Sequence, residues 1–163
     1  MTAKTTAKSA GALLLGLAFC FGCKGSNKTY TIPTVKNEIM KSIRVAMHHR
    51  GQGELTKASK EILKTGKKIL KTYPRATLSF KTVKRFLKTS TKIGNLCLDK
   101  GHELQQEAVS NKMWKLADVY KARHKTHQKL NAKLRELLPE IQKNEVSAKA
   151  KAASASTPGA VTP

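Results

Sequence analysis

The chain has 163 residues, of which 39% are hydrophobic and only 5% are aromatic. Its length is that of one domain, and its apolar content suffices for a helical bundle but argues against a β-sandwich, which needs more valine, tyrosine and tryptophan. Lysine and arginine total 32 against 10 acidic residues, a net charge of +22, so an anionic partner is expected.

Residues 1–22 are predicted to be an export signal. Lys4 and Lys8 form a short positive start, and an apolar run over 11–22 follows. At about 1.5 Å per residue this run would span about 18 Å as a helix, less than the ~30 Å hydrocarbon core of a bilayer. We therefore expect the segment to be cleaved rather than kept as a transmembrane anchor.

Cys23 follows Gly22 and precedes Lys-Gly-Ser, and in this setting it resembles the lipid-modified cysteine of bacterial lipoprotein signals. The resemblance covers residues 1–23 only. It implies that Cys23 is acylated and that the protein is exported, with a periplasmic or cell-surface location. Ordinary signal-peptidase cleavage near Gly22 is the alternative. In either case residues 23–33 are expected to be a short tether.

An all-α domain is predicted over 34–145, as a bundle of three or four helices. Apolar residues there recur every three or four positions, which also argues against full disorder. The first helix is expected over 35–50, with Thr34 as its N-cap. The second is expected over 54–73 and ends before Pro74.

The third helix is expected over 78–100, with Gly101 as its C-terminal cap. A long amphipathic fourth helix should start at 102 and run to about 138, with Pro139 as a kink or an end. The tail over 146–163 has low complexity and no large apolar side chains beyond valine, so it is predicted to be disordered.

The fourth helix carries a seam like that of a coiled coil. Its members, spaced by three and four, are Met113, Leu116, Tyr120, Arg123, His127, Leu130, Leu134, Leu137 and Ile141. Such a seam can pack within the chain or join subunits. A structural role in a homo-oligomer or envelope assembly is therefore one hypothesis for the function.

The strongest functional signal lies between Glu61 and Asp99, where ten basic residues occur without one acid. Helical spacing places most of these lysines opposite the apolar residues of the second and third helices, so each helix should have a cationic outer face. Ordinary solvated faces mix signs for i,i+4 support, and these do not. The candidate anion-binding residues are Lys57, Lys60, Lys64, Lys67, Lys68, Lys71, Lys81, Lys84, Arg85, Lys88 and Lys92.

The expected partners are anionic lipids, surface polysaccharide or acidic proteins. Nucleic acid is a weaker hypothesis because lysine far exceeds arginine, the side chain that grips phosphates bidentately. Phe86 is also predicted to lie on the apolar face, where it cannot stack on bases. The sequence thus favours a non-catalytic binding protein at a membrane or envelope surface.

No metal site, cofactor or catalytic activity is expected. His124 and His127 lie three residues apart and His48 and His49 end the first helix, but no complete set of zinc ligands accompanies either pair. His127 falls on the apolar seam, so a core histidine is the preferred interpretation. The sequence contains no glycine-rich phosphate loop and no nucleophile elbow.

Cys97 and Trp114 complete the set of unusual side chains. Cys97 lies in an apolar run and is expected to be a buried free thiol, or to pair with Cys23 if that residue carries no lipid. Trp114 falls off the apolar seam beside lysines, so it is either an interface residue or the result of a local shift in the helix face.

Overall fold

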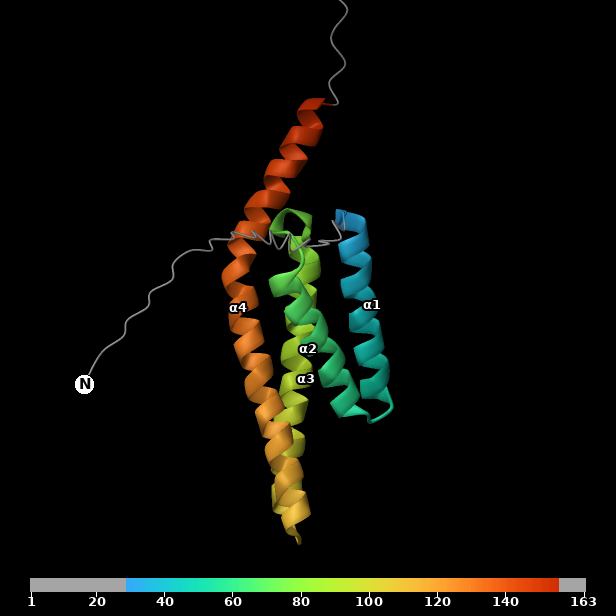
Figure 1. Ribbon diagram of the computed structural model, residues 1–163, viewed down its shortest axis with the longest axis vertical. Coiled ribbons are helices and arrows are strands. Elements are labelled where there is room, and N and C mark those ends of the chain that lie inside the picture. Colours follow the sequence, from blue (N-terminus) through green and yellow to red (C-terminus); the bar gives the residue numbers. More distant parts are fainter. Residues whose placement is uncertain (1–28, 156–163) are drawn as a thin grey trace, which may run out of the picture.

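The computed structural model describes residues 29–155, which form a four-helix bundle (Figure 1). The elements are α1 (Ile32–Gly51), α2 (Leu55–Lys71), the short 3-10 helix η1 (Arg75–Thr77), α3 (Phe80–Gln106) and α4 (Asn111–Ala155). This confirms the predicted all-α class, and no strand occurs in the part of the chain that is described. The predicted signal segment, Cys23 and the last eight residues lie outside it.

Two helical hairpins make up the bundle. One is the short pair α1 and α2, and the other is the long pair α3 and α4, which share the most extensive contact in the molecule. The α2 helix lies across α3 and also touches α4, so it joins the two hairpins. The C-terminal part of α4 extends past the ends of the other helices (Figure 1).

The core is mainly aliphatic and includes the aromatic rings of Phe86 and Tyr73. Every helix contributes the residues of one face, as the spacing of apolar positions predicts. Burying a large aliphatic or aromatic side chain stabilises a fold by roughly 1.5–3 kcal/mol, so this shared face accounts for the association of the four helices. Side chains with 0% exposure include Ile39, Ile62, Val83, Phe86, Ile93, Leu134 and Ile141.

The first hairpin begins earlier than predicted from the sequence, whereas its turn lies at the predicted position. The α1 helix starts at Ile32 rather than at residue 35, because Pro33 in the first turn loses no hydrogen bond there and has a suitable backbone angle. The turn to α2 includes Gly53, whose φ of 74° lies in the left-handed region that favours glycine.

Gly101 is not the C-terminal cap of the third helix, so that prediction is wrong. The α3 helix continues to Gln106, and α4 starts at Asn111 instead of residue 102. A Cβ atom at Gly101 would lie 3.2 Å from the Ala117 carbonyl oxygen and 3.0 Å from the Lys121 Cγ atom. The glycine therefore permits close packing of α3 against α4, and its value to the fold is tertiary rather than local.

Pro139 lies inside α4 and does not end it. The helix continues to Ala155, so the first ten residues of the predicted disordered tail are helical and exposed wherever their side chains are described. A contact with α3 directly before these ten residues explains part of the difference. Glu145 accepts a hydrogen bond from the Phe80 backbone N–H (2.9 Å), at the first turn of α3 where helical partners are missing.

The predicted seam of α4 packs mainly within the chain. His127, Leu130, Leu134 and Ile141 are buried against the other helices, and Leu137 is half-buried. Only the beginning of the helix departs from this, since Leu116 is 45% exposed. The apolar spacing of α4 is thus largely accounted for by its contact with α3.

Replacing Gly94 by alanine is predicted to destabilise the protein by about 1–2 kcal/mol, although alanine favours helices. The added Cβ would lie 2.9 Å from the Cβ of His127, an atom that no side-chain rotation can move. Urea unfolding would measure the change. Gly51→Ala is the matched control, because nothing lies within 4 Å of its Cβ position. Equal stability of the two variants would contradict the close-packing interpretation.

Candidate functional site

The lysines predicted to bind anions on α2 lie on its outer side. Lys60 lies two positions before the buried Ile62, and Lys64 lies two positions after it. Two positions correspond to a rotation of about 200° around the helix axis, so both side chains point away from the core. Lys67 and Lys71 flank buried Ile69 in the same way. These four lysines are all exposed, and we call them the α2 face.

The basic residues of α3 are placed by the same rule. Lys84 and Lys88 flank Phe86, and Lys92 lies two positions after buried Ser90. Lys81 and Arg85 precede buried Val83 and Leu87 by two positions each. The resulting exposed set, which we call the α3 face, consists of Lys81, Lys84, Arg85, Lys88 and Lys92.

Two of the eleven predicted residues are engaged with carboxylates and belong to neither face. Lys57 pairs with Glu54 three residues earlier. Lys68 pairs with Glu38 of α1, which also accepts a hydrogen bond from the Tyr73 hydroxyl. The hydrogen bond to Glu38 raises the pKa of Lys68, so this lysine remains charged and links α1 to α2.

The other nine residues have no ion pair among residues 29–155, where every lysine and arginine of the two faces lies. Lys84 is the one with an aromatic neighbour, since its Nζ atom lies 5.9 Å from the centroid of the Phe80 ring. Glu61, half-buried on the side of α2 that meets α1, is the nearest acid in sequence to the α2 face. The two faces therefore present nearly uncompensated positive charge.

Phe86 is completely buried, as predicted, and cannot serve as a stacking surface. Phe80 is half-buried at the start of α3. The two faces thus offer ammonium groups and one guanidinium, without exposed aromatic rings between them. This chemistry suits anionic groups in general rather than bases in particular.

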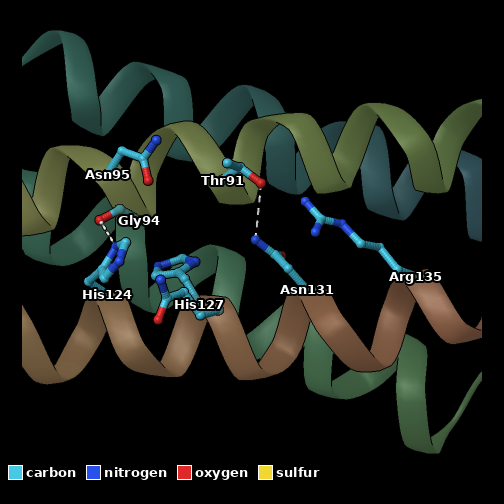
Figure 2. Close-up of a pocket in the computed structure, with 8 residues that line it drawn as sticks. Thr91, Gly94, Asn95, His124, His127, Asn131 and Arg135 are labelled. Atoms are coloured by element: carbon cyan, nitrogen blue, oxygen red, sulfur yellow. Dashed lines mark hydrogen bonds between the residues drawn. The ribbon is translucent and has the colours of Figure 1, made fainter.

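A polar pocket of about 300 Å³ lies between α3 and α4 (Figure 2). In Figure 2 the side chains of Asn131 and Arg135 reach from α4 toward α3, and Asn131 Nδ2 donates to Thr91 Oγ1 (3.1 Å). No carboxylate lines the pocket, so it offers a guanidinium and amide donors to a compact anion. Its lining consists of Thr91, Gly94, Asn95, His124, His127, Gln128, Asn131 and Arg135.

Sequence reasoning missed this pocket because its residues come from two helices that are far apart along the chain. One signal was available. His124, Asn131 and Arg135 follow a spacing of seven and four, which places them on a single side of α4. Nothing in the sequence showed that this side would meet the polar residues Thr91 and Asn95 of α3.

His127 is a core histidine, as predicted from its position on the seam. Its exposure is 1%, and its Nε2 and Nδ1 atoms lie 2.9 Å from Ser59 Oγ and 3.0 Å from Ser90 Oγ. A neutral imidazole donates from one nitrogen and accepts at the other, and serine hydroxyls can take either role. Burial, followed by the nearby charges of His124 and Arg123, lowers the pKa of His127 to about 4. His127 is therefore neutral at physiological pH.

The neighbouring His124 has a different role. Its Nδ1–H donates to the Gly94 carbonyl oxygen (2.9 Å), a contact that holds its ring at the wall of the pocket. No group of three or more histidine, cysteine or acidic side chains is arranged for a metal ion within residues 29–155. Cys97 is a buried free thiol there, and burial raises its pKa. Its alternative partner, Cys23, is not among the residues described.

Trp114 is 46% exposed in the first turn of α4, close in sequence to the exposed Leu116 and to Val109, which is 96% exposed. These side chains lie near the connection between α3 and α4, at the end of the long hairpin that projects past α1 and α2 (Figure 1). The lysines of the α2 and α3 faces are on other parts of the molecule. Trp114 is thus separate from both faces.

Comparison with known proteins adds no relative to these observations: no family model, no curated protein and no solved structure matches this chain. None of the helices within residues 29–155 contains an 18-residue stretch apolar enough to cross a membrane.

Stability is predicted to fall as the pH is lowered from about 6.5 to about 4. In this range unfolded His127 takes up a proton, whereas the buried ring stays neutral, so protons favour the unfolded state. The contribution of neutral His127 to stability is fully present above the pKa that it has in the unfolded chain, and it is lost below the pKa that it has in the folded protein. Urea unfolding at a series of pH values should show a decrease of about 3 kcal/mol from this residue.

His127→Gln should remove most of that pH dependence, whatever its effect on stability at neutral pH. His102→Gln is the matched control, because His102 is exposed on α3. The control should retain the wild-type slope. An unchanged slope in His127→Gln would show that other groups cause the pH dependence.

Proposed function

We propose that this protein is a non-catalytic, basic helical protein that binds an anionic partner at a membrane or envelope surface. The observation that carries the proposal is the set of nine exposed basic residues on α2 and α3 that have no ion pair among the described residues. Helices usually gain stability from pairs of opposite charge three or four residues apart, and the α2 and α3 faces contain no such ion pair. An anionic partner supplies the missing counter-charge.

The strength of such binding is consistent with a surface interaction. Each lysine or arginine near an anionic leaflet contributes about 1 kcal/mol, and the contribution decays within a Debye length of about 8 Å at physiological salt. A face of four or five such residues therefore gives useful affinity only where anionic groups are dense. Anionic lipid, polysaccharide and acidic protein surfaces all meet this condition.

Nucleic acid fits the site less well. Arg85 is the single arginine on the two faces, whereas bidentate phosphate recognition favours arginine. Phe86 is buried in the core, where it cannot contact a base. Electrostatic attraction alone would still give salt-dependent, sequence-independent binding to nucleic acid.

Export and lipid attachment are part of the proposal and rest on residues 1–23. A single acyl chain holds a protein at a membrane only marginally, and a basic patch is an effective second signal. Acylation of Cys23 would therefore complement the lysine faces. The alternative is a structural subunit that assembles through α4. Little apolar surface of α4 is left for such an interface, because His127, Leu130 and Leu134 are buried within the chain.

Replacing Lys64, Lys67, Lys84 and Lys88 together by glutamine is predicted to weaken binding to anionic vesicles or immobilised heparin at least about tenfold. The variant should also show a smaller dependence of binding on salt, because fewer counter-ions are released. Vesicle cosedimentation and elution from heparin at rising salt would measure both effects. All four side chains are exposed, so the fold should persist.

The matched control replaces four exposed lysines of α4, Lys115, Lys125, Lys129 and Lys133, by glutamine. This change removes the same charge from a different part of the bundle. The control should retain most of the binding. Equal losses in both variants would indicate that net charge, and not the α2 and α3 faces, determines the affinity.

Mass spectrometry of the mature N-terminus tests the proposed export and anchoring. For the protein isolated from membranes of its own host, we expect a chain that begins at Cys23 and carries an acyl mass. A mature chain without lipid that begins near Gly22 would support ordinary cleavage. An intact N-terminus that still includes residues 1–22 would contradict export.

A further inference from the structure

The α2 and α3 faces point to opposite sides of the bundle. On α2, Ser59 lies toward the interior, where it meets His127 and Cys97. On α3, Ser90 meets the same histidine from the other side (3.0 Å). Since α2 and α3 thus turn their buried sides toward each other, the lysines opposite those sides point away from each other.

The helical positions lead to the same conclusion. Each lysine of the α2 face is two positions, or about 200°, from Ile62 or Ile69, which are 0% and 1% exposed. Lys84 and Lys88 bear the same relation to Phe86, which is 0% exposed. Figure 1 shows α2 crossing α3 with α1 and α4 on either side, and α2 and α3 are in direct contact.

A flat anionic surface that contacts one of these faces cannot contact the other without unfolding the bundle. The helices are held by a core in which Ile39, Phe86 and Leu134 are fully buried, so the directions of the two faces are fixed relative to each other. The α2 face offers four cations and the α3 face five. These are two comparable cationic surfaces that one anionic plane cannot contact together, whereas the exposed lysines of α4 have the acids Asp118, Glu136 and Glu140 on the same helix.

We propose that the protein bridges two anionic lipid surfaces, one bound at the α2 face and the other at the α3 face. This inference rests on the proposed function and adds an activity to it, namely the clustering or apposition of membranes. Because each face is held at a fixed side of one rigid body, binding of the first surface leaves the second face exposed to solvent. A second surface can then bind with an avidity that neither face has alone.

The arrangement of the charges favours a lipid surface over a single small ligand. From Lys60 to Lys71 the α2 face extends for about 17 Å, and from Lys81 to Lys92 the α3 face extends for about the same length. Around the helix axis, the basic side chains span about 60° on α2 and about 100° on α3. A planar array of head groups can neutralise charges that spread in both directions.

The experiment uses the full chain and vesicles made of equal parts phosphatidylglycerol and phosphatidylcholine. Cosedimentation reports binding, and turbidity or dynamic light scattering reports clustering. Wild-type protein should bind these vesicles and cluster them, and added salt should reverse both effects. Vesicles of pure phosphatidylcholine should show no lysine-dependent binding or clustering.

Two variants separate the faces: Lys64→Gln/Lys67→Gln/Lys71→Gln on α2, and Lys84→Gln/Lys88→Gln/Lys92→Gln on α3. Each should still bind vesicles through its intact face, while clustering falls at least about fivefold. The matched control, Lys125→Gln/Lys129→Gln/Lys133→Gln on α4, removes the same charge and should cluster vesicles like the wild type. Thermal melts followed by circular dichroism establish that all three variants remain folded.

The outcomes distinguish this inference from the proposed function. Wild-type binding without clustering would overturn bridging and leave the proposed function intact. Clustering by either single-face variant at the wild-type level would also overturn it, as would loss of clustering in the α4 control. Binding to immobilised heparin without binding to the vesicles would overturn the lipid partner. A protein that binds neither heparin nor the anionic vesicles would overturn both proposals.

Discussion

The neutral imidazole of His127 is the contact on which the arrangement of three helices depends. It lies in α4 and is hydrogen-bonded to Ser59 of α2 and Ser90 of α3, at distances of 2.9 and 3.0 Å. Both ring nitrogens thus have a hydrogen-bond partner, and a side chain that is only 1% exposed needs such partners because water cannot reach it. Gly94 makes the contact possible, because a side chain there would collide with His127. The small serines and the glycine therefore fix how closely the helices approach and how each is rotated.

That rotation determines where the positive charge lies. Once Ser59 and Ser90 face the interior, helical geometry places Lys64 and Lys88 outside, on different sides of the bundle. The aliphatic core holds the helices together, although the lysines within each face repel one another. Uncompensated charge of this kind is tolerated because it is exposed to water and screened by salt. The same exposure makes it available to an anionic surface.

Features that repeat along one helix were predictable from the sequence. The all-α class, the burial of His127 and Phe86, and the exposure of the lysines all follow from a spacing of three and four residues. Features that depend on a second helix were not. Gly101 has the residue type of a C-terminal cap, yet it lies inside α3 because α4 packs closely there. Residues 146–155 were predicted to be disordered because they lack large apolar side chains, yet they extend α4; their alanines favour a helix, and Glu145 just before them contacts α3.

The sequence by itself determined that lysines and apolar residues are segregated on α2 and α3, since segregation within a helix depends only on local periodicity. The tertiary structure decided how these segregated faces are oriented. It directed the two lysine faces apart and brought Thr91 and Asn95 beside Asn131 and Arg135 to form a polar pocket. The physical reason is that the relative position of two helices is set by side chains that meet across them, which here are Ser59, Ser90, Gly94 and His127. Those residues are small or polar, and their spacing in the sequence does not predict which residues of another helix they contact.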